Sequence, residues 1–362
     1  MTTELESTAV AAASRRGLLT PQVVSQIAAS AAALDRGEQD TRDNLGLLAN
    51  GGLLGLGAPD NHDGALPAMA SAVAELAGQC MSTAFSLWAH RMTVEYLTAA
   101  ATPWSRGVAD DLLGGAALGV TGMASAFKDA AGCGSLELAA VSVDGGYRLS
   151  GSLRWASNLY RDSVMVTAAR TDSDEKIIVA LPLATRGVTI GDHFDLLALG
   201  STASSSLTLD DAYVGADQIL SRDTTAFLSR VRPTFLVLQS ALCVGLARRC
   251  LDEVAASLSG VNAVFATEFE ELTAELAGVE SGVAAFAEAV GGPATPGKRD
   301  LLTLRLGAAE IVNAAAALEI RTAGGKGYAS RTGASRRFRE AAFIPVQSPS
   351  EAQLRWELRN CP

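Results

Sequence analysis

The order in which hydrophobic patterns follow one another constrains the fold of this chain most. From about residue 18 to 125, apolar residues recur at helical spacing, from about 126 to 220 they form short alternating or β-branched runs, and from about 225 to 345 helical spacing returns. Apolar residues three and four apart line one face of a helix, whereas alternation lines one face of a strand. The order predicts an α+β fold that is mostly α, with an N-terminal helical domain (1–125), a middle β domain (126–222) and a C-terminal helical domain (223–362).

Turn and breaker residues support this division. Pro59, Gly64 and Pro103 fall between the apolar runs of the first zone, where they would end helices. An Asp-Gly-Gly sequence lies within residues 143–147 and is a clear hairpin signal. In the third zone the loop GGPATPGK separates two long helical runs. We therefore expect an antiparallel sheet in the middle and an antiparallel bundle of long helices after it.

Composition and charge exclude several classes of protein. Hydrophobic residues make up 48% of the 362 residues and mean hydropathy is +0.21, but alanine supplies most of this. We find no apolar run of about 18 residues without charge or glycine, so no membrane span is predicted. The N-terminus places acids before arginines, the wrong order for a secretory signal, so a cytoplasmic protein is expected. The net charge of −10 argues against nucleic acid as a partner.

Cysteines and histidines give no metal signal. The five cysteines lack CxxC or Cys/His spacing and are expected to be reduced and mostly buried. His62 and His193 lie in turn-like segments and should be solvated. Asp60, His62 and Asp63 are interpreted as a helix-capping turn rather than a metal site.

The most specific motif lies in residues 320–354. A long helical run leads into the glycine turn GGKGY, which begins at Gly324, and an arginine-rich run then leads to VQSPSEAQ around Gln347. Glycine accepts the left-handed conformation that ends a helix, so the turn is first of all a C-cap. The missing side chains would also let a cofactor diphosphate approach the backbone, and both interpretations stay open.

This stretch resembles the C-terminal end of the acyl-coenzyme A dehydrogenases, where a helix reads roughly IQIHGGYGY and a catalytic glutamate follows in YEGTSEIQ. Ser350, Glu351 and Gln353 match SEIQ, and Gln347 takes the position of the glutamate. In the middle zone, YRLSGSLRWASN and LGSTASSSLTLDDAYV resemble two further family segments. The resemblance covers nearly the whole chain. It implies an N-terminal helical domain, a central antiparallel β-barrel or sandwich, and a C-terminal four-helix bundle.

The resemblance also implies a cofactor and an assembly. It implies a flavin, FAD rather than FMN because the glycine turn is retained, and a small-molecule or acyl-thioester substrate. It implies a homodimer or homotetramer, or pairing with a homologous subunit, because cofactor contacts cross subunits in this family. The residues it assigns to the cofactor are Thr121, Trp155, Ser157, Arg321, Gly324, Gly325 and Gly327.

Three departures from the family pattern affect the usual chemistry. Glutamine has no proton affinity near neutral pH, so Gln347 cannot remove a substrate α-proton. The family's T-E-P-x-A-G-S-D segment is VTGMASAFKDAAG here and keeps Thr121, and the segment matching R-x-x-F-G has no arginine. Residues 232–235, where some family members carry the base, include no acid. Glu351 is expected to pair or to cap a helix rather than to replace the base.

His90 is the remaining candidate for chemistry. Its segment STAFSLWAHRM resembles a helix of flavin-dependent monooxygenases related to this family, in which histidines near the flavin help proton transfer. A pKa near neutrality suits that task. The structural alternative is a satisfied helix histidine beside Trp88.

Four functions follow from these observations. The first is a flavin-dependent dehydrogenase acting on the CH–CH group of an acyl thioester, which the fold supports and Gln347 opposes. The second is a flavin-dependent monooxygenase or oxidase on a non-thioester molecule, which needs no glutamate. The third is a subunit without its own base in a heteromeric dehydrogenase. The fourth is a non-catalytic interaction protein that keeps only the fold.

Overall fold

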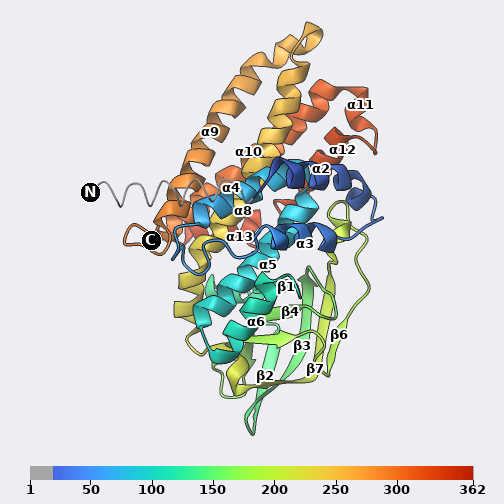
Figure 1. The fold of residues 1–362 in the computed structure, drawn as a ribbon. Coiled ribbons are helices and arrows are strands. Elements are labelled where there is room, and N and C mark those ends of the chain that lie inside the picture. The colour runs from blue at the N-terminus through green and yellow to red at the C-terminus, as the bar shows by residue number, and fades with distance from the viewer. Residues whose placement is uncertain (1–18, 362) are drawn as a thin grey trace, which may run out of the picture.

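A computed structural model describes residues 19–361, so the segment examined for a secretory signal lies outside the described residues. Helices occupy the upper and middle parts of the molecule and the sheet occupies its lower end (Figure 1). Thr20 and Thr102 cap two of the N-terminal helices through their hydroxyl oxygens, as expected for N-cap residues. The N-terminal helices are α2 (Pro21–Asp35), α3 (Arg42–Asn50), α4 (Leu66–Gln79), α5 (Met81–Ala100) and α6 (Pro103–Leu113).

Helix α5 lies at the centre of the molecule, and nearly all of its side chains are buried. Its Arg91 and Glu95 form a fully buried ion pair at 2.8 Å. The Glu95 carboxylate also accepts hydrogen bonds from the backbone N–H of Asp60 and from the hydroxyl of Thr234. This pair therefore ties α5 both to the turn before α4 and to the first helix of the C-terminal domain.

The strands form a single sheet in the order β6-β7-β3-β2-β4-β5-β8, with β1 paired to β4. The predicted hairpin is present, since Val143 pairs with Gly146 across the β2–β3 turn. The sheet is mainly antiparallel, as expected, and departs from this only where β4 pairs in parallel with both β1 and β2. The strands are β1 (Gly119–Gly122), β2 (Leu138–Val143), β3 (Gly146–Ala156), β4 (Val164–Thr171), β5 (Lys176–Pro182), β6 (Val188–Ile190), β7 (Ser205–Gly215) and β8 (Ile219–Ser221).

A short helix interrupts the predicted β zone. Helix α7 (Ala124–Ala130) lies between β1 and β2, within the segment VTGMASAFKDAAG. The sheet also begins at Gly119, before residue 126, where the middle domain was expected to start. The three-domain division itself stays a prediction.

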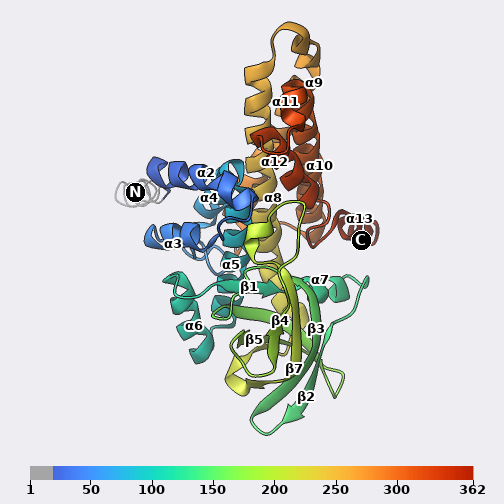
Figure 2. The same ribbon diagram turned by 90° about the vertical axis from the view of Figure 1, so that its right-hand side faces the viewer.

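The C-terminal helices form the predicted bundle, in which α8 packs against α9, α10 and α12. The C-terminal end of α8 and the N-terminal end of α9, which η3 joins, project from the body of the molecule (Figure 1). Figure 2 shows α13 beside the boundary between bundle and sheet, close to α7. A hydrogen bond from Trp356 Nε1 to the Ala131 carbonyl joins these two segments. The elements are α8 (Thr224–Ser257), η3 (Gly260–Phe265), α9 (Ala266–Ala289), α10 (Lys298–Ala323), α11 (Gly325–Tyr328), α12 (Gly333–Phe343) and α13 (Glu351–Arg359).

Two of these helices, α8 and α10, are long and apolar enough to cross a membrane by length and composition. In their most apolar windows 89% and 56% of the residues, respectively, are buried inside the fold. Helices of this kind form the core of a helical bundle, where apolar side chains face other helices. We therefore interpret α8 and α10 as core helices.

The N-terminal and C-terminal helices share one hydrophobic core, and the sheet has a second. The contact between α4 and α8 is so close that a Cβ atom at Gly245 would lie 1.7 Å from the Ala74 carbonyl oxygen. Only a residue without a side chain allows two helix backbones to approach in this way. Gly245 therefore sets the distance at which the two helical domains meet.

Candidate functional site

The position predicted for a catalytic base lies in a buried polar network. Gln347 follows α12 and is only 4% exposed. Its Oε1 accepts a hydrogen bond from Nη2 of Arg305, which is fully buried on α10, at 3.2 Å. The Arg305 Nε donates to Oε1 of Gln239 on α8, also at 3.2 Å. We call Arg305, Gln239 and Gln347 the polar clamp.

The hydrogen bonds of the clamp fix the orientation of both amides. Because a guanidinium has donors and no acceptor, both glutamines must turn their oxygens toward Arg305. The amide nitrogen of Gln239 then donates to the Ser348 carbonyl at 2.8 Å. The remaining hydrogen bonds of Arg305 go to the Ile344 carbonyl and to the Cys243 sulfur. Burial raises the pKa of that thiol, so every hydrogen-bond partner of Arg305 is uncharged.

An aromatic cluster lies next to the clamp. Phe235 is one helical turn before Gln239 on α8, and its ring contacts Trp88 of α5 and Phe127 of α7 with centroid distances of 5.0 and 4.7 Å. Phe85 stacks on Trp88 and meets Phe343 of α12 edge to face. Residues four apart share one face of a helix. The site therefore combines an aromatic surface with a polar one.

Several buried polar atoms around this cluster have no hydrogen-bond partner within residues 19–361. They are Trp88 Nε1, Ser125 Oγ, Gln347 Nε2, Ser348 Oγ and Gln353 Oε1. Buried polar groups in native proteins are almost always hydrogen-bonded, either to the protein or to a bound molecule. These atoms come from α5, α7, α13 and the segment before α13, all of which meet near the aromatic cluster. These atoms are the candidate hydrogen-bonding groups for a ligand bound beside the aromatic rings.

The residues predicted beside the flavin ring lie where the sheet meets α5. The hydroxyl of Thr121 on β1 lies 3.2 Å from the Tyr96 hydroxyl, and the hydroxyl of Ser157 lies 2.6 Å from that of Ser204. Trp155 is 62% exposed, and its ring centroid lies 4.2 Å from that of Phe194. The structure thus places an exposed indole and two hydroxyls on neighbouring segments.

Asn158 joins these segments and was not predicted from the sequence. Its side-chain amide donates to the carbonyls of Ser86 on α5 and Gly119 on β1, at 3.0 and 3.1 Å. Its backbone is left-handed, with φ of 60°, which asparagine tolerates better than most residues. It directly follows Ser157 in the segment RWASN. The resemblance of YRLSGSLRWASN to a family segment is the sequence feature that could have pointed to Asn158.

His90 has a structural role in this geometry. It is fully buried, and its Nδ1 accepts a hydrogen bond from the Gly119 N–H at 3.1 Å. Burial lowers the pKa of His90 to about 4, so the ring is neutral at neutral pH. These observations favour a helix histidine that holds β1 against α5, but not a fully satisfied one, because its Nε2 is buried without a partner among the described residues. A role in proton transfer stays a prediction that this pKa does not favour.

Arg321 and the glycine turn lie in another part of the molecule. Gly324 ends α10 with φ of 59°, and a Cβ atom added there or at Gly325 would meet open space. Gly327 is packed, because its Cβ would lie 2.9 Å from that of Ala323. Arg321 forms an exposed ion pair with Glu268 and lies over the Phe265 ring. The C-cap interpretation of Gly324 is confirmed, and the cofactor interpretation stays a prediction.

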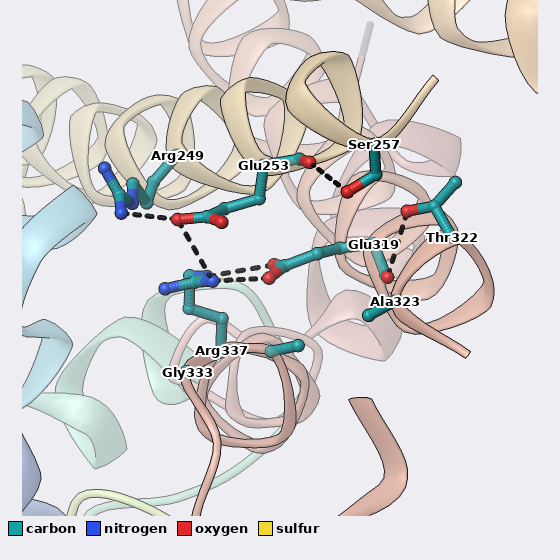
Figure 3. Close-up of a pocket in the computed structure, with 9 residues that line it drawn as sticks. Arg249, Glu253, Ser257, Glu319, Thr322, Ala323, Gly333 and Arg337 are labelled. Atoms are coloured by element: carbon teal, nitrogen blue, oxygen red, sulfur yellow. Dashed lines mark hydrogen bonds and ion pairs between the residues drawn. The ribbon is translucent and has the colours of Figure 1, made fainter. Parts of the chain in front are cut away.

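A polar cavity of about 320 Å³ lies beside the end of α10. Figure 3 shows Arg249 and Glu253 of α8, Glu319 of α10 and Arg337 of α12 facing one another across it. Arg337 pairs with Glu319 and approaches Glu253, which also pairs with Arg249. The four charges balance. Glu253 follows Gln239 by 14 residues on α8, which places the cavity roughly 21 Å along the helix from the clamp.

The other candidates behave as expected for surface and capping residues. His62 and His193 are exposed, Asp60 pairs with Arg230, and Asp63 accepts a hydrogen bond from the Ala65 N–H. Glu351 pairs with Arg355 at 2.8 Å, while Ser350 caps α13. Within residues 19–361 no group of three His, Cys, Asp or Glu side chains is arranged to hold a metal.

Comparison with solved structures identifies the fold. Butyryl-CoA dehydrogenase from Megasphaera elsdenii superposes with a TM-score of 0.85 at 17% identity, covering 96% of this chain and 97% of that one. KijD3 in complex with FMN and dTDP-3-amino-2,3,6-trideoxy-4-keto-3-methyl-D-glucose superposes with a TM-score of 0.79 at 18% identity, covering 95% and 92%. The chain therefore has the fold of the acyl-CoA dehydrogenases and of their flavin-dependent relatives.

Sequence comparison finds relatives of one particular kind. The chain is 29% identical to the amino sugar nitrososynthase DnmZ of Streptomyces peucetius over 185 residues, which is 49% of this chain and 44% of that protein. It is 30% identical to the L-evernosamine nitrososynthase of a Micromonospora species over 212 residues, 55% of this chain and 50% of that protein. The matches thus span about half the length of these curated relatives. No family model matches the chain.

Proposed function

We propose that this protein is a flavin-dependent monooxygenase that transfers oxygen to the amine of a small, non-thioester substrate. The observation that carries this proposal is Gln347, which stands in the position expected for a base and is hydrogen-bonded to the buried Arg305. A glutamine cannot remove an α-proton, so the chemistry favoured here needs no base at this position. The similarity to two nitrososynthases supports an amine as substrate.

The chain's residues fit a flavin in two places. The unpartnered buried atoms around the aromatic cluster suit a planar ring with polar edges. Thr121 and Trp155 lie on strands β1 and β3, and Ser157 directly follows β3. When bound in its reduced form, a flavin supplies two electrons to O₂, so that one oxygen atom reaches the amine and the other leaves as water. The residues of this site would orient the ring and the substrate and exclude bulk water.

We propose FAD rather than FMN as the cofactor. The open space around Gly324 and Gly325 would admit a diphosphate or adenine group. Arg321 pairs with Glu268 at the surface, where ion pairs contribute at most about 1 kcal/mol, so it can exchange this carboxylate for a phosphate. Flavin released from the purified protein by heat and separated by chromatography distinguishes the two cofactors.

We also propose a homo-oligomeric, cytoplasmic enzyme. Large apolar side chains are highly exposed near the glycine turn, namely Val261, Val264 and Tyr328. Others are exposed on either side of the boundary between bundle and sheet, namely Trp155, Leu197 and Val346. Exposed apolar surface of this kind marks protein interfaces, and a homodimer or homotetramer would cover it.

Two reactions of the flavin-loaded protein test the proposed function. With a reducing system, O₂ and a dTDP-linked 3-amino sugar, we expect a hydroxylamine or a more oxidised nitrogen product by mass spectrometry. Under anaerobic conditions, acyl thioesters of different chain lengths should leave the oxidised flavin spectrum unchanged. Bleaching of the flavin by a thioester, without any oxidised amine, would instead establish dehydrogenation.

A further inference from the structure

We propose that Arg305 is a positioning residue that turns the Gln347 amide so that its N–H groups face an oxygen acceptor of the bound substrate. Gln347 is then a hydrogen-bond donor in its own right, not a disabled base. The ligand in this inference rests on the proposed function, whereas the contact between Arg305 and Gln347 does not. The acceptor would be a carbonyl or another electron-rich oxygen of a small molecule.

The orientation follows from hydrogen-bonding capacity. An arginine side chain offers only donors, so the atom of Gln347 that lies 3.2 Å from Arg305 Nη2 is an oxygen. Arg305 is itself held by Gln239 and by the Ile344 carbonyl, and Gln239 is anchored through the Ser348 carbonyl. With each amide oxygen committed to Arg305, the nitrogen of Gln347 must point away from it.

That nitrogen has no partner within the described residues, although its residue is 96% buried, being only 4% exposed. The hydroxyl of the next residue, Ser348, is buried and unpartnered as well. Leaving a buried donor unsatisfied is unfavourable, and a ligand acceptor would remove that penalty. The Gln347 amide nitrogen and the Ser348 hydroxyl are therefore two adjacent groups that could hydrogen-bond to one ligand oxygen.

The charge of Arg305 adds a preference among acceptors. Its hydrogen-bond partners are two amides, a carbonyl and a neutral thiol, so none of them offsets its positive charge. A charge in a low-dielectric interior acts strongly on nearby groups, and it polarises the amide that it contacts. The N–H groups of Gln347 therefore favour an electron-rich oxygen over a cationic group.

The first test needs no ligand. In Gln347→Glu the introduced carboxyl would face Arg305, which lowers its folded pKa below the unfolded value of about 4.3. The variant should then gain melting temperature relative to the wild type above about pH 4.3 and lose that gain as the pH falls through the folded pKa. Adding Arg305→Met should abolish the gain. A Gln347→Glu variant that is less stable than the wild type at pH 7, and recovers on acidification, would overturn the positioning role.

The second test measures affinity by calorimetry for a dTDP-linked 3-amino-4-keto sugar. Gln347→Leu should weaken binding roughly 3- to 10-fold, the equivalent of about one hydrogen bond. Arg305→Met should weaken binding in the wild type but add nothing in the Gln347→Leu background, because it acts through Gln347. Arg305→Lys keeps the charge and should restore part of the affinity.

A matched control is Gln218→Leu, which removes an amide hydrogen-bonded to the Ala180 carbonyl in the β domain and should leave the affinity unchanged. Equal affinity of Gln347→Leu and wild type, or additive effects of Arg305→Met and Gln347→Leu, would overturn the donor role. A wild-type protein that does not bind the sugar contradicts the ligand part of this inference. Product formation from another amine would keep the proposed function in that case, and the pH test would still judge the positioning role.

Discussion

At the scale of single residues, the surroundings of Gln347 decide what a carboxylate could do in its place. The Arg305 guanidinium lies within hydrogen-bond distance of this position. None of the groups to which it donates hydrogen bonds is charged. An opposite charge this close favours the ionised form of a carboxyl and lowers its pKa. A carboxylate held in this way is a weak base, because its conjugate acid is strong.

We therefore expect that Gln347→Glu alone will not create an acyl-CoA dehydrogenase. The flavin-loaded variant should stay oxidised when it is mixed anaerobically with butyryl-CoA and followed by its absorbance. Gln347→Glu combined with Arg305→Met removes the guanidinium. Any thioester oxidation should therefore be faster in this double variant than in Gln347→Glu alone. Rapid bleaching in the single variant would show that only the base was missing from this site.

His90 makes acid stability testable at one residue. Burial lowers the pKa of His90 in the folded state to about 4, from an ordinary value of 6.5. Between these two pH values the imidazole is protonated in the unfolded chain but neutral in the folded protein. The stabilisation linked to neutral His90 is present above about pH 6.5 and is lost as the pH falls toward 4, by about 3 kcal/mol at most.

His90→Gln should flatten this part of the stability curve. Glutamine is neutral throughout the range and can still accept from the Gly119 N–H. Chemical denaturation of both proteins between pH 7 and 4 measures the difference. His62→Gln, at an exposed position, is the control and should follow the wild type. Parallel pH curves for wild type and His90→Gln would contradict a buried neutral His90.

At the scale of elements, the α4–α8 crossing depends on a single glycine. Gly245→Ala would place a methyl group 1.7 Å from the Ala74 carbonyl oxygen, so the helices must move apart. Overpacking of this kind costs about 1–3 kcal/mol of unfolding free energy. Gly307→Ala on α10 meets nothing within 4 Å and should stabilise the protein by up to about 1 kcal/mol. Equal melting temperatures of the two variants would contradict the close crossing.

The same scale shows which elements a sequence pattern can predict. The long helices were predicted because each must bury a continuous apolar face, which repeats along the chain. The pairing of β1 with β4 was not, since β1 spans only Gly119–Gly122 and its partner begins at Val164. Helix α7 was missed for two reasons. Its seven residues are too few to show a helical period, and its segment was compared with the family's T-E-P-x-A-G-S-D motif rather than tested for a helix.

At the scale of the whole molecule, exposed apolar residues predict self-association. Val261 and Val264 are 84% and 76% exposed on η3. Asn262 bonds this turn to the Thr322 carbonyl on α10, and Tyr328 beyond the glycine turn is 89% exposed. These residues offer an apolar surface to a second copy of the chain.

Light scattering after size exclusion should therefore give a mass at least twice the 37.2 kDa of one chain. Val261→Glu would bury a charge in this interface and should shift the mass toward the monomer. Val143→Glu, in the β2–β3 hairpin outside this surface, is the control. A wild-type protein that elutes as a monomer would contradict the predicted assembly.

The candidate site could be predicted only in part. Motif resemblance points to Gln347, Thr121, Trp155 and Ser157 as candidates, because each lies within a recognisable segment. It did not identify Arg305, which occurs in LTLRLGAAE as an ordinary helical arginine 42 residues before Gln347. Only the packing of α10 against α8 and against the segment that follows α12 brings its guanidinium to both glutamines. Such contacts depend on tertiary structure, which no local pattern encodes.

The central claim is that this fold carries out oxygen transfer rather than thioester dehydrogenation. The most direct test supplies the flavin-loaded protein with a reducing system, a dTDP-linked 3-amino sugar and ¹⁸O₂. We predict an oxidised amine that contains ¹⁸O from the gas and that is absent without flavin. Flavin bleaching by an acyl thioester under anaerobic conditions, with no ¹⁸O in any amine product, would contradict the claim.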